Sequence, residues 1–111
     1  MVEEGVALYA GVIIGERARV GSGTVMNHGC VLAHDSSVEK ACFLGPGVVI
    51  AGNCRIGEGC YLSTGARIGS GVQLASGWIV GAGAVVLNSF EESPSAGEFL
   101  AGIPATVRYR K

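Results

Sequence analysis

The chain has 111 residues, enough for one domain, with a formal net charge of −1 and 15% charged residues. This balance, without an extended basic run, excludes the usual electrostatic footprint of a nucleic-acid-binding protein. No apolar stretch approaches the roughly 18 residues of a membrane span, and the Met-Val-Glu-Glu-Gly start is not a secretion signal. We therefore expect a cytoplasmic protein with no nucleic-acid or membrane partner.

Aliphatic residues recur at every sixth position from Val2 to Val86. All fifteen positions of this series hold an aliphatic residue or methionine, without one insertion. They are Val2, Leu8, Ile14, Val20, Met26, Leu32, Val38, Leu44, Ile50, Ile56, Leu62, Ile68, Leu74, Val80 and Val86. A period of six matches neither the period of about 3.6 of an α-helix nor that of about 3.5 of a coiled coil, so the pattern does not indicate helices.

Glycine stands three residues after ten of the fifteen aliphatic positions. Because glycine adopts positive φ without steric cost, these positions predict corners of the chain. Asp35 and Asn53, of the next most tolerant residue types, fill two of the other corner positions. Six residues suit a short strand and a turn, and three such sides close a triangular coil of about eighteen residues.

The repeat therefore predicts an all-β protein, a parallel β-helix of about five coils. We assign residues 1–87 to this hexapeptide-repeat domain and residues 88–111 to a C-terminal loop and returning strand. The register is lost after Val86, where polar residues 87–97 are expected to cap the open end, and residues 99–105 are expected to form the returning strand.

Stacking the coils at intervals of eighteen residues sorts the outward side chains into three faces. The first face holds Ala7, Val25, Phe43, Tyr61 and Ile79, the second holds Ile13, Val31, Val49, Arg67 and Val85, and the third holds Arg19, Ser37, Arg55 and Gln73. Two faces are apolar and one is polar. Two adjacent exposed apolar faces predict a homotrimer, since such surfaces normally mark interfaces and a small domain gains from association.

The corner between the second and third faces carries the residues with the clearest chemistry. His34 and Asp35 stand there, and Gly52 and Ser70 follow His34 one and two coils on, so the imidazole is expected to face a groove with few side chains. A neutral histidine beside a carboxylate can take a proton from an amine or hydroxyl. The alternative is that His34 is a polar corner residue and Asp35 a turn former.

Several motifs resemble the hexapeptide transferase superfamily, above all its sugar O- and N-acetyltransferases of the sialic acid and bacillosamine type. The motifs are Asn-His-Gly-Cys-Val-Leu-Ala-His-Asp at 27–35, Leu-Gly-Pro-Gly at 44–47, Ala-Gly-Asn at 51–53, Ile-Gly at 56–57, Val-Gly-Ala-Gly-Ala-Val-Val at 80–86 and Ala-Gly-Ile-Pro-Ala at 101–105. The resemblance covers nearly the whole chain. It implies that the β-helix is left-handed.

The resemblance also implies site residues. His34 corresponds to the family's general base and Asp35 to the acidic residue that tunes it, while acetyl-CoA lies between subunits near the positions of Gly52, Thr64 and Ala82. We therefore predict an acyltransferase that moves an acetyl group from acetyl-CoA, its co-substrate, to an amine or hydroxyl of a small acceptor such as a sugar.

Two departures from the family favour a second interpretation. Phe43, beside the cofactor position, stands where members often carry another histidine, so it is expected either to contact the cofactor or to pack in the trimer face. The family's N-terminal domain, which binds the nucleotide-sugar, has no counterpart in this sequence. The alternative function is therefore a catalytically lapsed or purely structural trimer that binds a ligand or a partner through the same groove.

The remaining histidine and the four cysteines raise the question of a metal site. His28, on the corner between the apolar faces, is expected either to pack near the threefold axis or to contact the acceptor together with Asn27. The γ-class carbonic anhydrases share this fold and hold zinc with three histidines, but only His28 and His34 exist here and they lie on different corners. No metal is therefore expected. The cysteines occupy small inward positions of the repeat, at 30, 42, 54 and 60, and are expected to be reduced and inert.

Overall fold

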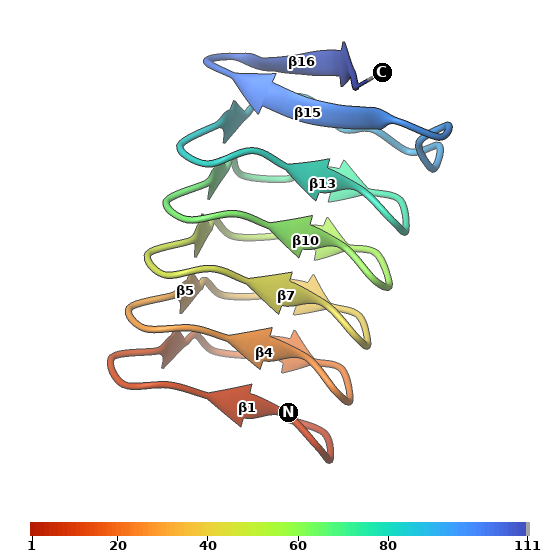
Figure 1. The fold of residues 1–111 in the computed structure, drawn as a ribbon. Coiled ribbons are helices and arrows are strands. Elements are labelled where there is room, and N and C mark those ends of the chain that lie inside the picture. Colours follow the sequence, from red (N-terminus) through yellow and green to blue (C-terminus); the bar gives the residue numbers. More distant parts are fainter. Residues whose placement is uncertain (111) are drawn as a thin grey trace.

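The chain folds into a triangular prism of stacked coils in the computed structural model, which describes residues 1–110 (Figure 1). Lys111, the last residue of the predicted C-terminal segment, lies outside the described residues. The prism measures 36 × 22 × 22 Å. The predicted all-β parallel β-helix of about five coils is confirmed.

Three sheets form the sides of the prism. The first sheet contains β1 (Ala7–Leu8), β4 (Val25–Met26), β7 (Phe43–Leu44), β10 (Tyr61–Leu62), β13 (Ile79–Val80), β15 (Glu98–Gly102) and β16 (Ala105–Tyr109). The second contains β2 (Ile13–Ile14), β5 (Val31–Leu32), β8 (Val49–Ile50), β11 (Arg67–Ile68) and β14 (Val85–Val86). The third contains β3 (Arg19–Val20), β6 (Ser37–Val38), β9 (Arg55–Ile56) and β12 (Gln73–Leu74).

Strands of neighbouring coils pair in parallel at the predicted offset. Val25 lies opposite Phe43, Val31 opposite Val49 and Arg19 opposite Ser37, each eighteen residues on. The outward residues therefore form the three faces read from the sequence. Residues 1–110 contain no helix long and apolar enough to cross a membrane.

Every predicted corner glycine has positive φ, and so do Asp35 and Asn53. Arg17 and Ala41 adopt the same left-handed conformation, each at a φ of 59°. Neither side chain favours this region, so the position in the repeat, rather than the residue type, imposes it. Each coil must turn at the same height for its strands to pair with the next coil.

Replacement of Ala41 by glycine is expected to raise the stability of the fold. The substitution relieves the left-handed strain, and a gain of about 0.5 to 1 kcal/mol remains after the extra backbone entropy of unfolded glycine. Thermal unfolding followed by circular dichroism would show a higher Tm. Ala10→Gly, at a corner residue outside the left-handed region, is the control and is expected to lower the Tm.

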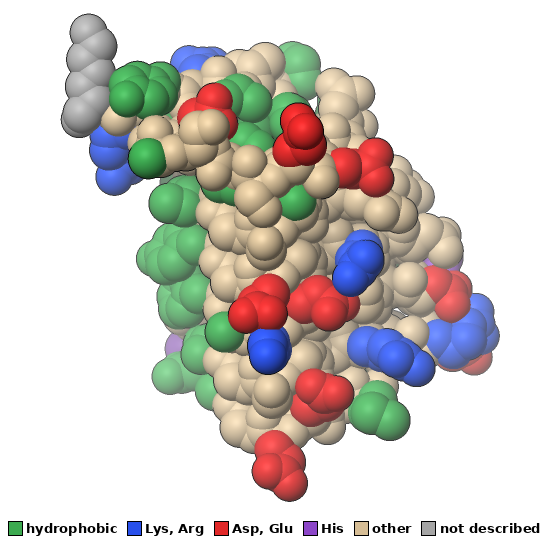
Figure 2. All heavy atoms as spheres, turned by 90° about the vertical axis from the view of Figure 1, so that its right-hand side faces the viewer, with side chains coloured by type: hydrophobic (Ala, Val, Ile, Leu, Met, Phe, Trp, Pro, Cys, Tyr) green, Lys and Arg blue, Asp and Glu red, His purple; other side chains and the backbone are tan. Residues whose placement is uncertain are grey.

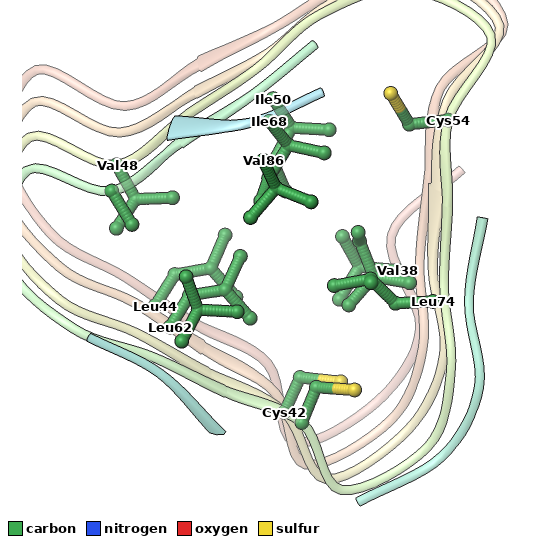
Figure 3. Packing of buried hydrophobic residues seen from close by; sticks show 14 of the residues in the cluster. Val38, Cys42, Leu44, Val48, Ile50, Cys54, Leu62, Ile68, Leu74 and Val86 are labelled. Atoms are coloured by element: carbon green, nitrogen blue, oxygen red, sulfur yellow. The ribbon is translucent and has the colours of Figure 1, made fainter. Parts of the chain in front are cut away.

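Inward aliphatic side chains fill the prism in columns (Figure 3). Leu44, Ile50 and Leu62 are fully buried, and the repeat places each under an equivalent residue of the next coil. The four cysteines are buried free thiols of this core. Burial raises the pKa of the Cys42 thiol to about 12, so the thiol stays protonated at neutral pH.

The C-terminal segment differs from the expected single returning strand. Residues 99–105 bend within a hairpin: β15 pairs in parallel with β13 through Leu100 and Val80, and β16 pairs antiparallel with β15. The hairpin thereby covers an edge of the first sheet that would otherwise present unpaired backbone groups. Trp78 packs edge-on against Phe90 and donates a hydrogen bond to the Glu92 carbonyl, which closes this end of the core.

Candidate active site

Four consecutive coils stack their turns at the corner between the second and third sheets, here called the histidine corner: residues 16–17, 34–35, 52–53 and 70–71. Backbone hydrogen bonds hold these turns in register. The Asp35 amide donates to the Glu16 carbonyl at 2.9 Å, and the Asn53 amide donates to the His34 carbonyl at 3.1 Å. The Gly71 amide donates to the Gly52 carbonyl at 3.0 Å. The predicted column is therefore confirmed.

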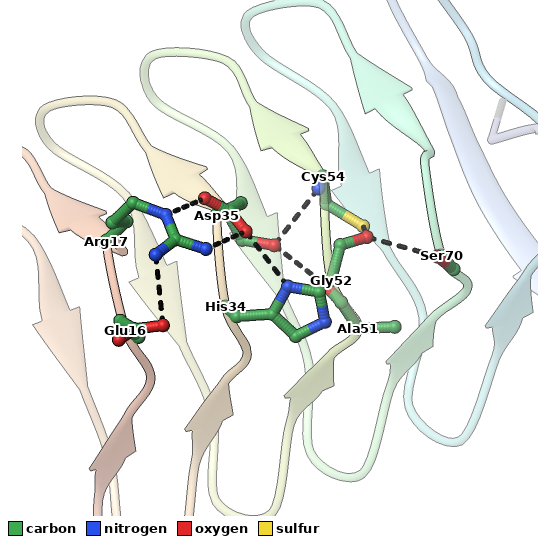
Figure 4. Close-up of polar contacts among 9 residues, drawn as sticks. Glu16, Arg17, His34, Asp35, Ala51, Gly52, Cys54 and Ser70 are labelled. Atoms are coloured by element: carbon green, nitrogen blue, oxygen red, sulfur yellow. Dashed lines mark hydrogen bonds and ion pairs between the residues drawn. The ribbon is translucent and has the colours of Figure 1, made fainter.

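His34 and Asp35 interact directly (Figure 4). His34 Nδ1 lies 3.1 Å from Asp35 Oδ2. Hydrogen bonds from Arg17 and then from His34 are the main causes that lower the pKa of Asp35 to about 2. The carboxylate is thus ionised near neutral pH and has no proton to donate, so in the neutral imidazole the shared proton belongs to His34 Nδ1 and Nε2 carries the lone pair.

The imidazole lies over Gly52 of the next coil. A Cβ placed on Gly52 would come within 2.6 Å of His34 Nε2, so the ring occupies the space that a larger residue would fill. Gly52 itself is buried, whereas the His34 side chain is 59% exposed. The ring therefore packs against Gly52 on one side, and the exposed part of the side chain is accessible to a reactant.

Arg17 is the residue of this site to which the sequence reasoning assigned no role. It donates two hydrogen bonds to Asp35, from Nε to Oδ1 at 2.6 Å and from a terminal nitrogen to Oδ2 at 3.0 Å. The interval of eighteen residues between Arg17 and Asp35 places them in one column, and this interval could have predicted their contact.

The other predicted site residues lie on the opposite side of the second sheet. His28, Thr64 and Ala82 are exposed at the corner between the first and second sheets, with Asn27 beside His28. Phe43 lies on β7, half-buried, and stacks on Tyr61 with ring centroids 4.8 Å apart. One protomer therefore brings His34, Asp35 and Gly52 together but does not bring Thr64 and Ala82 to them.

His28 is held by its neighbours. Asn27 Oδ1 accepts a hydrogen bond from the His28 amide and lies 2.7 Å from His28 Nδ1, and the ring packs edge-on against Tyr9. The described residues contain no group of three His, Cys, Asp or Glu side chains arranged to hold a metal ion.

Residues 35–70 match the family model for bacterial transferase hexapeptide (six repeats). The chain is similar to GDP-perosamine N-acetyl transferase from Caulobacter crescentus, solved in complex with CoA and GDP-perosamine: the TM-score is 0.84 and the sequence identity 33%, over 98% of this chain and 53% of that one. It is also similar to the acetyltransferase domain of PglB from Neisseria gonorrhoeae, solved with acetyl coenzyme A, with a TM-score of 0.69 and 27% identity over 95% of this chain and 55% of that one.

A maltose O-acetyltransferase from Clostridium difficile shares the fold, with a TM-score of 0.82 at 17% identity over 99% of this chain and 68% of that one. No curated protein shows significant sequence similarity to the chain. The chain spans about half the length of the Caulobacter and Neisseria structures. The repeat, the coil and these likenesses agree: the chain belongs to the hexapeptide-repeat β-helix acetyltransferase family.

Proposed function

We propose that the protein transfers an acetyl group from acetyl-CoA to an amine or hydroxyl of a small acceptor, with His34 as the general base. The observation that carries this proposal is an imidazole whose Nδ1 is held by an ionised carboxylate, whose Nε2 lies over a bare glycine, and whose side chain is 59% exposed. The structures with 33% and 27% identity contain CoA or acetyl-CoA, which supports the same co-substrate here. The perosamine enzyme supports a sugar amine as the acceptor.

The proposed reaction is a direct transfer. Nε2 of His34 takes a proton from the acceptor while the acceptor nitrogen or oxygen forms a bond to the thioester carbonyl carbon. The tetrahedral intermediate then collapses, the carbon–sulfur bond breaks, and the imidazolium returns the proton to the departing thiolate of CoA. Asp35 remains ionised and stabilises the imidazolium between the two steps.

Besides leaving space for the His34 ring, Gly52 is proposed to bind the thioester through its backbone. Its backbone N–H donates to no backbone carbonyl within residues 1–110, so it is available for the carbonyl oxygen of the thioester, where negative charge develops. We place the pantetheine arm of the co-substrate along this column and against the Thr64 and Ala82 corner of a neighbouring protomer. This arrangement requires a neighbouring protomer, which the proposed homotrimer supplies.

The outward faces support the trimer. Ile13, Tyr61 and Ile79 on the first two sheets are 61%, 48% and 42% exposed, while charged side chains spread over the third sheet (Figure 2). Exposed apolar surface of this extent is typical of an interface between copies.

Light scattering after gel filtration is expected to give the mass of three chains of 11.3 kDa. Ile79→Glu places a charge in the proposed interface and is expected to shift the protein toward monomer. Gln73→Glu adds the same charge to the polar face of the same coil and is expected to keep the mass of the wild type. A wild-type mass of one or two chains would contradict the trimer.

Turnover of acetyl-CoA tests the function directly. Release of free CoA thiol, followed with a panel of amino sugars, nucleotide-linked amino sugars and sugar alcohols, is expected to depend on the acceptor. Acetyl-CoA binding in the micromolar range should accompany it in calorimetry. The absence of both turnover and binding at millimolar acetyl-CoA would overturn the proposal.

A second candidate is a binding protein without catalysis. Phe43 favours it, because this side chain stacks on Tyr61 and offers no polar group beside the proposed groove. Acetyl-CoA binding without turnover of any acceptor in the panel would support this candidate over the enzyme.

A further inference from the structure

We infer that Arg17 and Gly52 are positioning residues for the His34 imidazole, Arg17 acting through Asp35 from the coil before and Gly52 from the coil after. This inference rests on the proposed function, because it explains how the proposed base keeps its orientation. It assigns a role to a side chain, Arg17, that contacts neither His34 nor the open face of the ring.

Arg17 holds the Asp35 carboxylate with a two-pronged contact. Its Nε and one terminal nitrogen bind the two carboxylate oxygens at 2.6 and 3.0 Å, a geometry that matches the planar fork of arginine. Glu16 accepts a hydrogen bond from the other terminal nitrogen at 3.0 Å, which braces the guanidinium. Arg17 therefore fixes both carboxylate oxygens, including Oδ2, which faces the ring.

The contact sets the tautomer of His34. Asp35 Oδ2 is shared between Arg17 and His34 Nδ1, so a carboxylate fixed by Arg17 presents an acceptor to Nδ1 in one orientation. The Asp35 side chain is 32% exposed and would otherwise rotate toward water. Lysine offers a compact point charge and cannot bind both oxygens in one plane.

Gly52 limits the ring from the other side. A methyl group there would lie 2.6 Å from Nε2 and 2.7 Å from Cε1 of His34. At Gly15, Gly21 and Gly57 an added methyl group would instead meet backbone atoms first. Since Gly52 is outside the left-handed region, its backbone accepts alanine, and the three atoms nearest to the added methyl group all belong to the imidazole.

Arg17→Met tests whether Arg17 positions the His34 imidazole. Long-range nitrogen-15 NMR is expected to show the His34 proton on Nδ1 in the wild type and a mixture of tautomers in the variant, with the His34 signals assigned by their loss in His34→Ala. The kcat is expected to fall about tenfold with an unchanged KM for acetyl-CoA, and Arg17→Lys should not restore it.

Arg19→Met removes the same charge from the third sheet, two residues away, and is the matched control with wild-type tautomer and kcat. The charged groups that contact the His34 and Asp35 pair in this protomer are Arg17 and, through it, Glu16. A wild-type tautomer ratio in Arg17→Met would overturn the role of Arg17. The NMR measurement requires no turnover, so it decides the role even if the proposed function fails.

A double-mutant cycle of Gly52 and His34 tests whether Gly52 positions the imidazole. Gly52→Ala is expected to lower kcat about 100-fold without a change in Tm, since displacement of a reacting group by about 1 Å has effects of this order. In a His34→Ala background the same change should have no further effect. An equal loss of acetyl-CoA affinity in both backgrounds would overturn the inference, because Gly52 would then act on the co-substrate alone. Wild-type turnover by His34→Ala would instead refute the proposed function.

Discussion

Replacement of His34 by alanine is expected to lower kcat on the order of 1,000-fold, because the acceptor then loses its proton to water. The KM for acetyl-CoA should change little, since the pantetheine arm is proposed to bind backbone groups. The side chain is 59% exposed, so its removal leaves no buried cavity and the Tm should stay that of the wild type. Steady-state release of CoA thiol with an accepted sugar measures the effect.

Equal turnover by the wild type and His34→Ala would remove His34 from the mechanism and leave it a polar corner residue.

Asp35→Asn is expected to have the second large effect, again on the order of 1,000-fold in kcat. Asparagine tolerates the φ of 59° at this corner, so the fold is retained. Arg17 would hold the amide oxygen, which turns the amide NH₂ group toward His34 Nδ1. The imidazole proton would then move to Nε2, where no proton can be accepted.

The difference in stability between the wild type and this variant has a predictable pH dependence. The folded pKa of Asp35, about 2, lies below its ordinary value of 3.8, so the carboxylate contacts stabilise the fold above pH 3.8 and are lost as the pH falls toward 2. The difference in Tm between wild type and Asp35→Asn should therefore shrink over that interval. A constant difference would mean that the Arg17 contact contributes nothing to stability.

Much of the fold follows from one translational rule. A side chain repeated at every sixth position, from Val2 to Val86, assigns each residue to a side, a corner or the core, so the pairing of Val25 with Phe43 and the column of His34 above Gly52 were both predictable. The rule ends where the repeat ends. The hairpin of β15 and β16 depends on which sheet edge is left open, and residues 99–105 carry no periodic signal for it.

The sequence by itself determined the β-helix, its three faces and the pairing of His34 with Asp35, because in a periodic fold a position in the chain is a position in space. Only the tertiary structure decided that Arg17 clamps Asp35, that Ala41 takes a left-handed corner, that Phe43 stacks on Tyr61 and that the imidazole fills the space of a missing methyl group. These depend on side-chain reach and rotamer between coils, and the repeat specifies where a side chain starts but not where it ends.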